Sequence, residues 1–186
     1  MGNLGYRVSK RCVWRADFLI FVTVGNAVQG FDRLMTAVEE MKRCILQDVD
    51  IFVQYGNSIV VPNNCSSAAF LSRDEFNQFI GDASVIITHG GEGSIMKCLQ
   101  AGKRPIVVPR QKVFGEHVND HQFELVRRLE IQGRVAAVYD IAGLTDAVMQ
   151  ARDRGILLTA ASGDSGIRVL VKNFLDRLAD EKDASR

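Results

Sequence analysis

The sequence predicts an α/β domain with a doubly wound, Rossmann-like parallel sheet. Two observations support this fold class. Short apolar runs recur along the chain, from FLIFVTV at 18–24 to VAAV at 135–138, and segments with helical spacing separate them. The runs are apolar almost throughout, as is typical of parallel strands that helices cover on both faces. Ligands of such a fold bind beyond the carboxyl ends of the strands.

Each element has its own signal. The first run is rich in β-branched and aromatic residues, which favours a strand buried on both faces. Further strands are expected at 51–53, 59–61, 85–87, 106–108 and 135–138. A helix follows the first strand, because apolar residues recur there at spacings of three and four: Phe31, Leu34, Val38, Met41 and Ile45. Other helices are expected near 73–81, 92–101, 117–130 and 140–153, with Ser72 and Asp140 as N-caps.

Length, charge and cysteines limit the classes of protein to consider. The 186 residues suit one main domain over 17–180, between a variable segment, 1–16, and a charged tail, 181–186. The net charge of +1 argues against a nucleic-acid-binding protein. Every apolar run is shorter than the ~18 residues of a membrane span, and the first run ends in Gly25 rather than in a cleavage site. The four cysteines form no C-x-x-C pair, which favours reduced thiols and a cytoplasmic location.

A glycine-rich segment, THGGEGS at 88–94, follows one expected strand and opens the next expected helix. The start of a helix offers unpaired N–H groups and the positive end of the helix dipole, and glycines let phosphate oxygens come close. His89 and Ser94 add side-chain donors. The segment lacks the P-loop pattern G-x-x-x-x-G-K-S/T, and Met96 stands where a dinucleotide fingerprint has its third glycine. It therefore predicts a phosphate site of another kind, unless the glycines serve only a tight turn.

Two further loops follow expected strands. Gly25 and Asn26 close the first strand, where glycine either allows a ligand to approach the backbone or serves an ordinary turn. The loop after the strand at 106–108 leads into a cluster of polar residues: Glu116, His117, Asn119, Asp120, His121 and Gln122. His117 and His121 are one turn apart, and zinc is one interpretation if His89 lies near them. Because H-E-x-x-H is absent, hydrogen bonding to a polyhydroxylated ligand such as a sugar is favoured.

Four segments stand in order over residues 18–130: FVTVGNAVQGFDRLMTAVEEM, FVQYG, VIITHGGEGSIMKCLQAGKRPIVVPR and GEHVNDHQFELVRRL. Together they resemble the glycosyltransferase family 28 C-terminal domain, the nucleotide-sugar-binding half of GT-B glycosyltransferases. The resemblance is greatest to stand-alone versions of this half. These are the cytosolic catalytic subunit of the transferase that adds the second GlcNAc to dolichol-linked GlcNAc, and bacterial exopolysaccharide glucuronosyltransferase subunits. It implies a single GT-B C-terminal-type domain.

The resemblance implies a role for each loop. The UDP diphosphate would be held by the glycine-rich segment, namely His89, Gly90, Gly91, Gly93 and Ser94, with Arg110 as a further candidate. The donor sugar would be contacted by Glu116, His117, Asn119, Asp120, His121 and Gln122, the last at the usual sugar-binding glutamine. Gly25 and Asn26 would face the interdomain cleft. Lys97 stands where many relatives have a ribose-binding glutamate, and lysine cannot accept a hydrogen bond from a ribose hydroxyl.

The implied activity is that of the donor-binding, catalytic subunit of a two-component, inverting UDP-sugar glycosyltransferase in polysaccharide or glycolipid biosynthesis. Such domains stabilise the leaving diphosphate without a metal, so neither metal nor cofactor is expected. The chain has no room for an acceptor-binding half, which usually carries the general base. We therefore expect a membrane-anchored partner that binds a lipid-linked acceptor and recruits the chain to the cytoplasmic face of a membrane. The apolar stripe at 167–178 either packs on its own sheet or docks this partner.

The sequence leaves the donor and one alternative open. UDP-glucuronate and UDP-GlcNAc differ in a carboxylate and an acetamide, and Arg110, Lys112 or His117 could meet either group. The alternative function is a non-catalytic sensor or regulatory subunit that binds a UDP-sugar. An epimerase acting on UDP-sugars is a third interpretation, and it too would need a second lobe.

Overall fold

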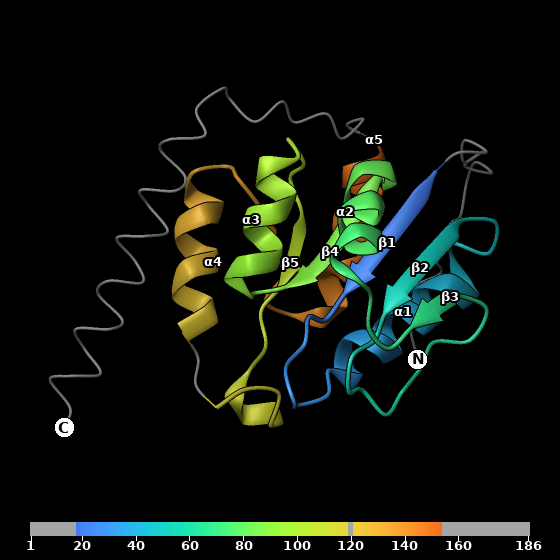
Figure 1. Cartoon of the computed structure of the whole chain (residues 1–186), viewed down its shortest axis with the longest axis horizontal. Coiled ribbons are helices and arrows are strands. Elements are labelled where there is room, and N and C mark those ends of the chain that lie inside the picture. The colour runs from blue at the N-terminus through green and yellow to red at the C-terminus, as the bar shows by residue number, and fades with distance from the viewer. Residues whose placement is uncertain (1–17, 119–120, 154–186) are drawn as a thin grey trace, which may run out of the picture.

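One parallel sheet forms the centre of the protein (Figure 1). The computed structural model describes residues 18–118 and 121–153, without the side chain of His121. In these ranges six strands lie in the order β3-β2-β1-β4-β5-β6, and every neighbouring pair is parallel. The strands are β1 (Leu19–Thr23), β2 (Asp50–Gln54), β3 (Ser66–Ala68), β4 (Val85–His89), β5 (Ile106–Val108) and β6 (Ala136–Ala137). The predicted Rossmann-like fold is confirmed.

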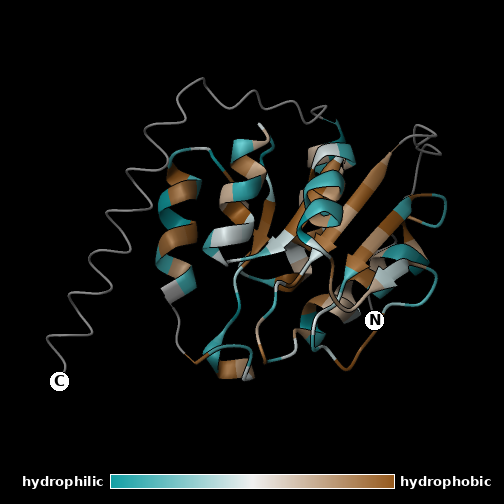
Figure 2. Ribbon diagram, in the orientation of Figure 1, coloured by the Kyte–Doolittle hydropathy of each residue, from teal (hydrophilic) through white to brown (hydrophobic). Residues whose placement is uncertain are grey.

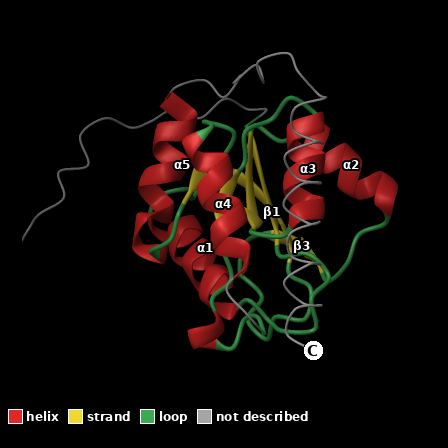
Figure 3. Cartoon of the chain, turned by 90° about the vertical axis from the view of Figure 1, so that its left-hand side faces the viewer, coloured by secondary structure: helices red, strands yellow, loops and turns green. Residues whose placement is uncertain are grey.

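Helices cover both faces of this sheet (Figure 3). They are α1 (Asp32–Cys44), α2 (Arg73–Asp82), α3 (Glu92–Gln100), α4 (His121–Ile131) and α5 (Leu144–Asp153), with short 3-10 turns η1 (Lys112–Phe114) and η2 (Ile141–Gly143). The core clusters show that α1 and α5 pack on one face, and α2, α3 and α4 on the other. Within residues 18–118 and 121–153, no helix is long and apolar enough to cross a lipid bilayer.

The alternation of side chains along β1 explains this layering. Ile20 and Val22 belong to the core under α1 and α5, whereas Phe21 between them packs against α2. The ring of Phe21 lies 5.2 Å from that of Phe79 and 5.6 Å from that of Phe76. Burial of a side chain of this size contributes about 1.5–3 kcal/mol. In Figure 2 β1 and β2 are accordingly hydrophobic along most of their length, whereas the edge strand β3 is pale.

One expected strand and the starts of two helices differ from the sequence-based expectation. The prediction of a strand at 59–61 is wrong, because the amides of Ile59 and Val60 donate to the Asp32 carboxylate at 2.7 and 2.9 Å and not to a neighbouring strand. The edge strand is β3 instead. Helix α4 begins at His121 rather than at 117, and α5 begins at Leu144, since Asp140 caps the short turn η2.

Other expectations hold or lie outside the described ranges. Ser72 caps α2 as predicted, in a capping box in which Glu75 bonds back to its backbone N–H. The expected segments 1–16 and 181–186 and the apolar stripe at 167–178 lie outside the described residues.

Candidate functional site

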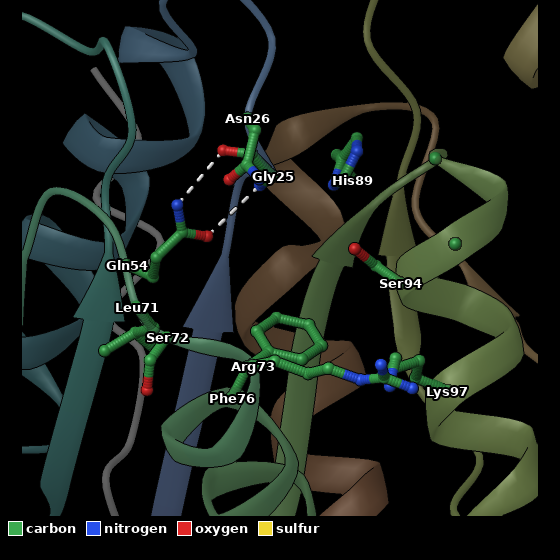
Figure 4. A pocket seen from close by; sticks show the side chains of 12 residues that line it. Gly25, Asn26, Gln54, Leu71, Ser72, Arg73, Phe76, His89, Ser94 and Lys97 are labelled. Carbon is green, nitrogen blue, oxygen red and sulfur yellow. Dashed lines mark hydrogen bonds between the residues drawn. The ribbon is translucent and has the colours of Figure 1, made fainter.

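A pocket of about 430 Å³ opens at the carboxyl ends of β1, β2 and β4 (Figure 4). β1 lies between β2 and β4, so the chain turns to opposite sides of β1 at this point of the sheet. This is where open α/β sheets bind their ligands. The lining consists of Gly25, Asn26, Gln54, Leu71, Ser72, Arg73, Phe76, His89, Gly91, Gly93, Ser94 and Lys97. The structure thus brings together the first loop and the glycine-rich segment.

The imidazole of His89 lies between two glycines. A Cβ atom placed on Gly25 would come within 2.4 Å of His89 Cε1, and one placed on Gly91 within 2.0 Å of His89 Nε2. Gly25 also has a φ of +72°, which side chains disfavour. Packing around the histidine therefore requires glycine at both positions, whatever ligand binds.

His89 is a neutral histidine. It is only 9% exposed, and burial lowers its pKa from 6.5 to about 3. The positive charge of Arg110 acts in the same direction, while a hydrogen bond with the Thr23 backbone opposes it. The Nδ1 atom is buried and has no hydrogen-bond partner among the described residues. A neutral imidazole carries a single N–H, so a ligand that accepts a hydrogen bond from His89 takes the place of the Thr23 carbonyl.

The start of α3 forms one wall of the pocket. Its N-cap is Gly91, which supplies no side-chain cap for the first-turn amides. A Cβ placed on Gly93 would meet nothing within 4 Å, so packing does not require glycine there. Glycine in a helix costs about 0.5–1 kcal/mol relative to alanine. Close approach of a ligand to the first turn would explain why glycine occupies this position.

Gln54 is a pocket residue that the sequence did not point to. Its Oε1 atom accepts hydrogen bonds from Thr23 Oγ1 (2.5 Å) and from the Gly25 amide (3.2 Å). Its Nε2 atom donates to the carbonyls of Gly25 and Ala69, each at 3.0 Å. The side-chain amide is thus occupied within the chain, and it fixes the loop that packs against His89.

The opposite end of the pocket is partly apolar and carries two cations. Arg73 and Phe76 come from the first turn of α2, Leu71 and Ser72 from the two residues before it, and Lys97 from α3. In Figure 4 the Arg73 side chain extends across the pocket toward Lys97. The Lys97 Nζ atom donates to Asn77 Oδ1 at 2.9 Å. No aspartate or glutamate is among the lining residues given above. The residues at the start of α2 were not predicted from the sequence, because only the order of the sheet brings α2 to the site.

Arg110 and Glu116 connect two loops beside the pocket and do not line it. The Arg110 guanidinium is fully buried and donates to the carbonyls of Val24, Gln29, Gly30 and Glu116 at 2.9–3.1 Å. The Glu116 carboxylate accepts two hydrogen bonds from Arg33 and one from the Gln111 amide, all at 2.9 Å. The two terminal nitrogens of Arg110 are thus held by loop carbonyls, whereas its Nε atom has no hydrogen-bond partner among the described residues. A contact of Arg110 with the diphosphate stays a prediction.

Gln122 packs against the glycine-rich segment from the other side. A Cβ placed on Gly90 would lie 2.7 Å from Gln122 Oε1, and this oxygen accepts a hydrogen bond from the Arg110 amide at 3.1 Å. His117 lies in the preceding loop. Asn119, Asp120 and the His121 side chain lie outside the described residues. The donor-sugar roles of residues 116–122 thus remain predictions, as does the absence of a metal.

A parallel sheet with a pocket at the point where its connections diverge, walled by a glycine-rich helix start, is the arrangement in which α/β domains commonly bind phosphate groups. Residues 19–155, well over half of the chain, match the family model of the glycosyltransferase family 28 C-terminal domain. The chain belongs to this family, as its motifs predicted.

The sequence of the chain is also similar to that of individual curated proteins. It is 31% identical over 127 residues to UDP-N-acetylglucosamine transferase subunit ALG13 of Homo sapiens, a match that covers 62% of this chain and 10% of that protein. The chain therefore spans about a tenth of the length of the curated relatives it matches.

Two solved structures share the fold. Acinetobacter baumannii MurG has a TM-score of 0.58 at 17% identity, over 79% of this chain and 45% of that one. CalG4, the calicheamicin glycosyltransferase, has a TM-score of 0.55 at 16% identity, over 92% and 48%. The predicted GT-B C-terminal-type fold is thereby confirmed.

Proposed function

We propose that the chain is the donor-binding subunit of a UDP-sugar glycosyltransferase. The observation that carries this proposal is the start of α3, where Gly91, Gly93 and Ser94 line a pocket together with the neutral His89. Membership of the family supports a nucleotide-sugar ligand. The names of the relatives favour UDP-GlcNAc, and UDP-glucuronate is the competing donor.

The diphosphate lies at the start of α3 in this proposal. The first-turn amides, the Ser94 hydroxyl and the His89 imidazole donate hydrogen bonds to its oxygens. These donors are fixed before the reaction, so they stabilise the negative charge that grows on the diphosphate as the sugar leaves. The sugar would point toward residues 116–122, and the nucleoside toward Leu71 and Phe76, whose apolar side chains suit a base.

A partner subunit completes the site in this proposal. The lining has no carboxylate, and a histidine with a pKa of about 3 is a poor base near neutral pH. The base for the acceptor hydroxyl would come from a membrane-anchored partner that binds a lipid-linked acceptor. That partner would also recruit the chain from the cytoplasm to the membrane. Strong transferase activity of the purified chain by itself would contradict this part of the proposal.

Calorimetric titration of the purified chain with UDP, UDP-GlcNAc and UDP-glucuronate tests the proposal. UDP should bind, and His89→Ala should weaken its binding by about 1–3 kcal/mol through loss of a hydrogen bond to a charged group. His117→Ala is the matched variant: it should weaken a UDP-sugar but leave UDP unchanged, because residue 117 lies on the sugar side. Unchanged UDP affinity in His89→Ala would remove His89 from the diphosphate site.

A non-catalytic UDP-sugar sensor is the second candidate, and the lack of a base in the lining also fits it. Sugar transfer to a lipid-linked acceptor, by the chain combined with membranes of its source, separates the two functions. Transfer that requires both components supports the transferase. UDP-sugar binding without any transfer supports the sensor.

A further inference from the structure

We propose that Arg73 and Lys97 form a cationic wall at the nucleoside end of the pocket. This wall recognises the nucleotide by its negative charge and leaves the ribose 2′-hydroxyl unrecognised. The inference rests on the proposed function, because it assumes that the diphosphate lies at the start of α3. It defines the substrate class more closely: nucleoside diphosphate sugars in which ribose and 2′-deoxyribose are accepted nearly alike.

The two cations stand where the nucleoside must pass. Lys97 is three residues after Ser94, on the next turn of α3, and Arg73 is on the first turn of α2. Both line the same cavity, and Arg73 extends across it toward Lys97 (Figure 4). Leu71 and Phe76 continue the lining beside them. A nucleoside that leads from the diphosphate toward these apolar side chains lies between the two cations.

Each of three side-chain acceptors at this end already accepts at least one hydrogen bond within the chain. A site that selects for a hydroxyl group usually accepts a hydrogen bond from it, and Arg73 and Lys97 can only donate. Gln54 Oε1 already accepts from Thr23 and Gly25, and Asn77 Oδ1 accepts from Lys97 itself. Ser72 Oγ accepts from the Glu75 amide. The ribose hydroxyls thus face the hydrogen-bond donors of Arg73 and Lys97. The other ribose oxygens can accept hydrogen bonds from the same donors when the 2′-hydroxyl is absent.

Charge takes the place of hydroxyl recognition. Two like charges face one cavity, and none of its lining residues is acidic. Their repulsion and the positive end of α3 both favour a ligand with several negative charges. Lys97 is held by Asn77, so its ammonium group is positioned before the ligand arrives.

The test compares calorimetric binding of UDP and 2′-deoxy-UDP to the wild type, Lys97→Gln and Lys97→Glu. The wild type should bind the two nucleotides within about threefold of each other, because a site that makes no strong bond to the 2′-hydroxyl loses little without it. Lys97→Glu should weaken UDP by about tenfold or more and raise the preference for UDP over 2′-deoxy-UDP, since a carboxylate repels the diphosphate and accepts from the hydroxyl. Lys97→Gln, which keeps a donor for Asn77, should fall between.

Arg43→Glu is the matched control. It makes the same change in net charge at the exposed carboxyl-terminal end of α1, where the neighbouring Lys42 bonds to the Val49 carbonyl just before the amino end of β2, whereas the pocket lies at the carboxyl ends of the strands. It should leave both nucleotide affinities unchanged.

Three results would overturn the inference. A wild type that binds UDP more than about thirtyfold better than 2′-deoxy-UDP has a true hydroxyl site. If Lys97→Glu keeps the wild-type affinity for UDP, then Lys97 of the wild type does not recognise the charge of the nucleotide. A folded wild type that binds neither nucleotide overturns the proposed function itself, and this inference with it.

Discussion

Gly93 offers a direct test of ligand approach to α3, with Gly81 as its internal control. Both glycines lie within helices, both are exposed, and a Cβ atom on either would meet nothing within 4 Å. Only Gly93 lines the pocket. Replacement by alanine should therefore have the same effect on folding at both positions and a different effect on binding.

The expected magnitudes follow from these surroundings. Each alanine should raise the free energy of unfolding by up to about 1 kcal/mol, because it removes the helix penalty of glycine without a clash. In Gly93→Ala the methyl group occupies space at the first turn of α3 and holds the diphosphate away from an amide. Loss of one hydrogen bond to a charged group costs about 2 kcal/mol, or roughly thirtyfold in the dissociation constant for UDP.

Urea denaturation measures the stabilities, and calorimetry measures UDP binding. Gly93→Ala should be as stable as the wild type or more so, yet bind UDP more weakly, while Gly81→Ala should keep wild-type affinity. A Gly93→Ala variant with wild-type UDP affinity would show that the diphosphate does not approach this turn. Ligand approach would then not explain why residue 93 is glycine.

Three further predictions concern the residues around the pocket. The pKa of His89 is about 3 in the folded chain against an ordinary 6.5, so stability is complete above 6.5 and is lost as the pH falls toward 3. In urea titrations, the wild type should lose about 1 kcal/mol per pH unit below 6.5 relative to His89→Asn, and parallel curves would contradict a buried neutral histidine. Glu116→Gln should lower the free energy of unfolding by about 2 kcal/mol, because it leaves the half-buried Arg33 without its charged partner. Glu124→Gln, which breaks the exposed ion pair with Arg128, should cost less than about 0.5 kcal/mol in the same assay, and equal losses would argue against a special role for Glu116. Gln54→Ala should cost about 2–3 kcal/mol and broaden the NMR signal of the Gly25 amide, since the side chain loses four hydrogen bonds, two of them to Gly25; a sharp, unshifted signal would refute its role in positioning.

The fold was predictable because its strands are buried on both faces. Runs such as VII at 85–87 and IVV at 106–108 are apolar for that reason, and the structure has strands there. The run IVV at 59–61 has the same local appearance but a different environment. Its amides bond to Asp32, a residue far away in the sequence, and Ile59 is 89% exposed. Pro62, which follows the run and has no N–H to donate, was the local sign against a strand.

The site was predictable only in part. Glycines directly after strands pointed to the loops at Gly25 and at residues 88–94, and both line the pocket. The reason for two of those glycines was not visible, because Gly25 and Gly91 make room for the His89 ring, which comes from a different strand than Gly25. Gln54 and Arg73 have ordinary sequence surroundings, and they reach the pocket through the order of the sheet. Sequence spacing carries no information about such contacts.

The most direct test of the central claim is an NMR titration of the ¹⁵N-labelled chain with UDP. If the diphosphate binds at the start of α3, the amide signals of Gly91, Gly93 and Ser94 should shift with one common dissociation constant. The signals of Gly81 and Gly133, which do not line the pocket, should stay in place. Saturable shifts elsewhere with unmoved signals at Gly91, Gly93 and Ser94 would contradict the account.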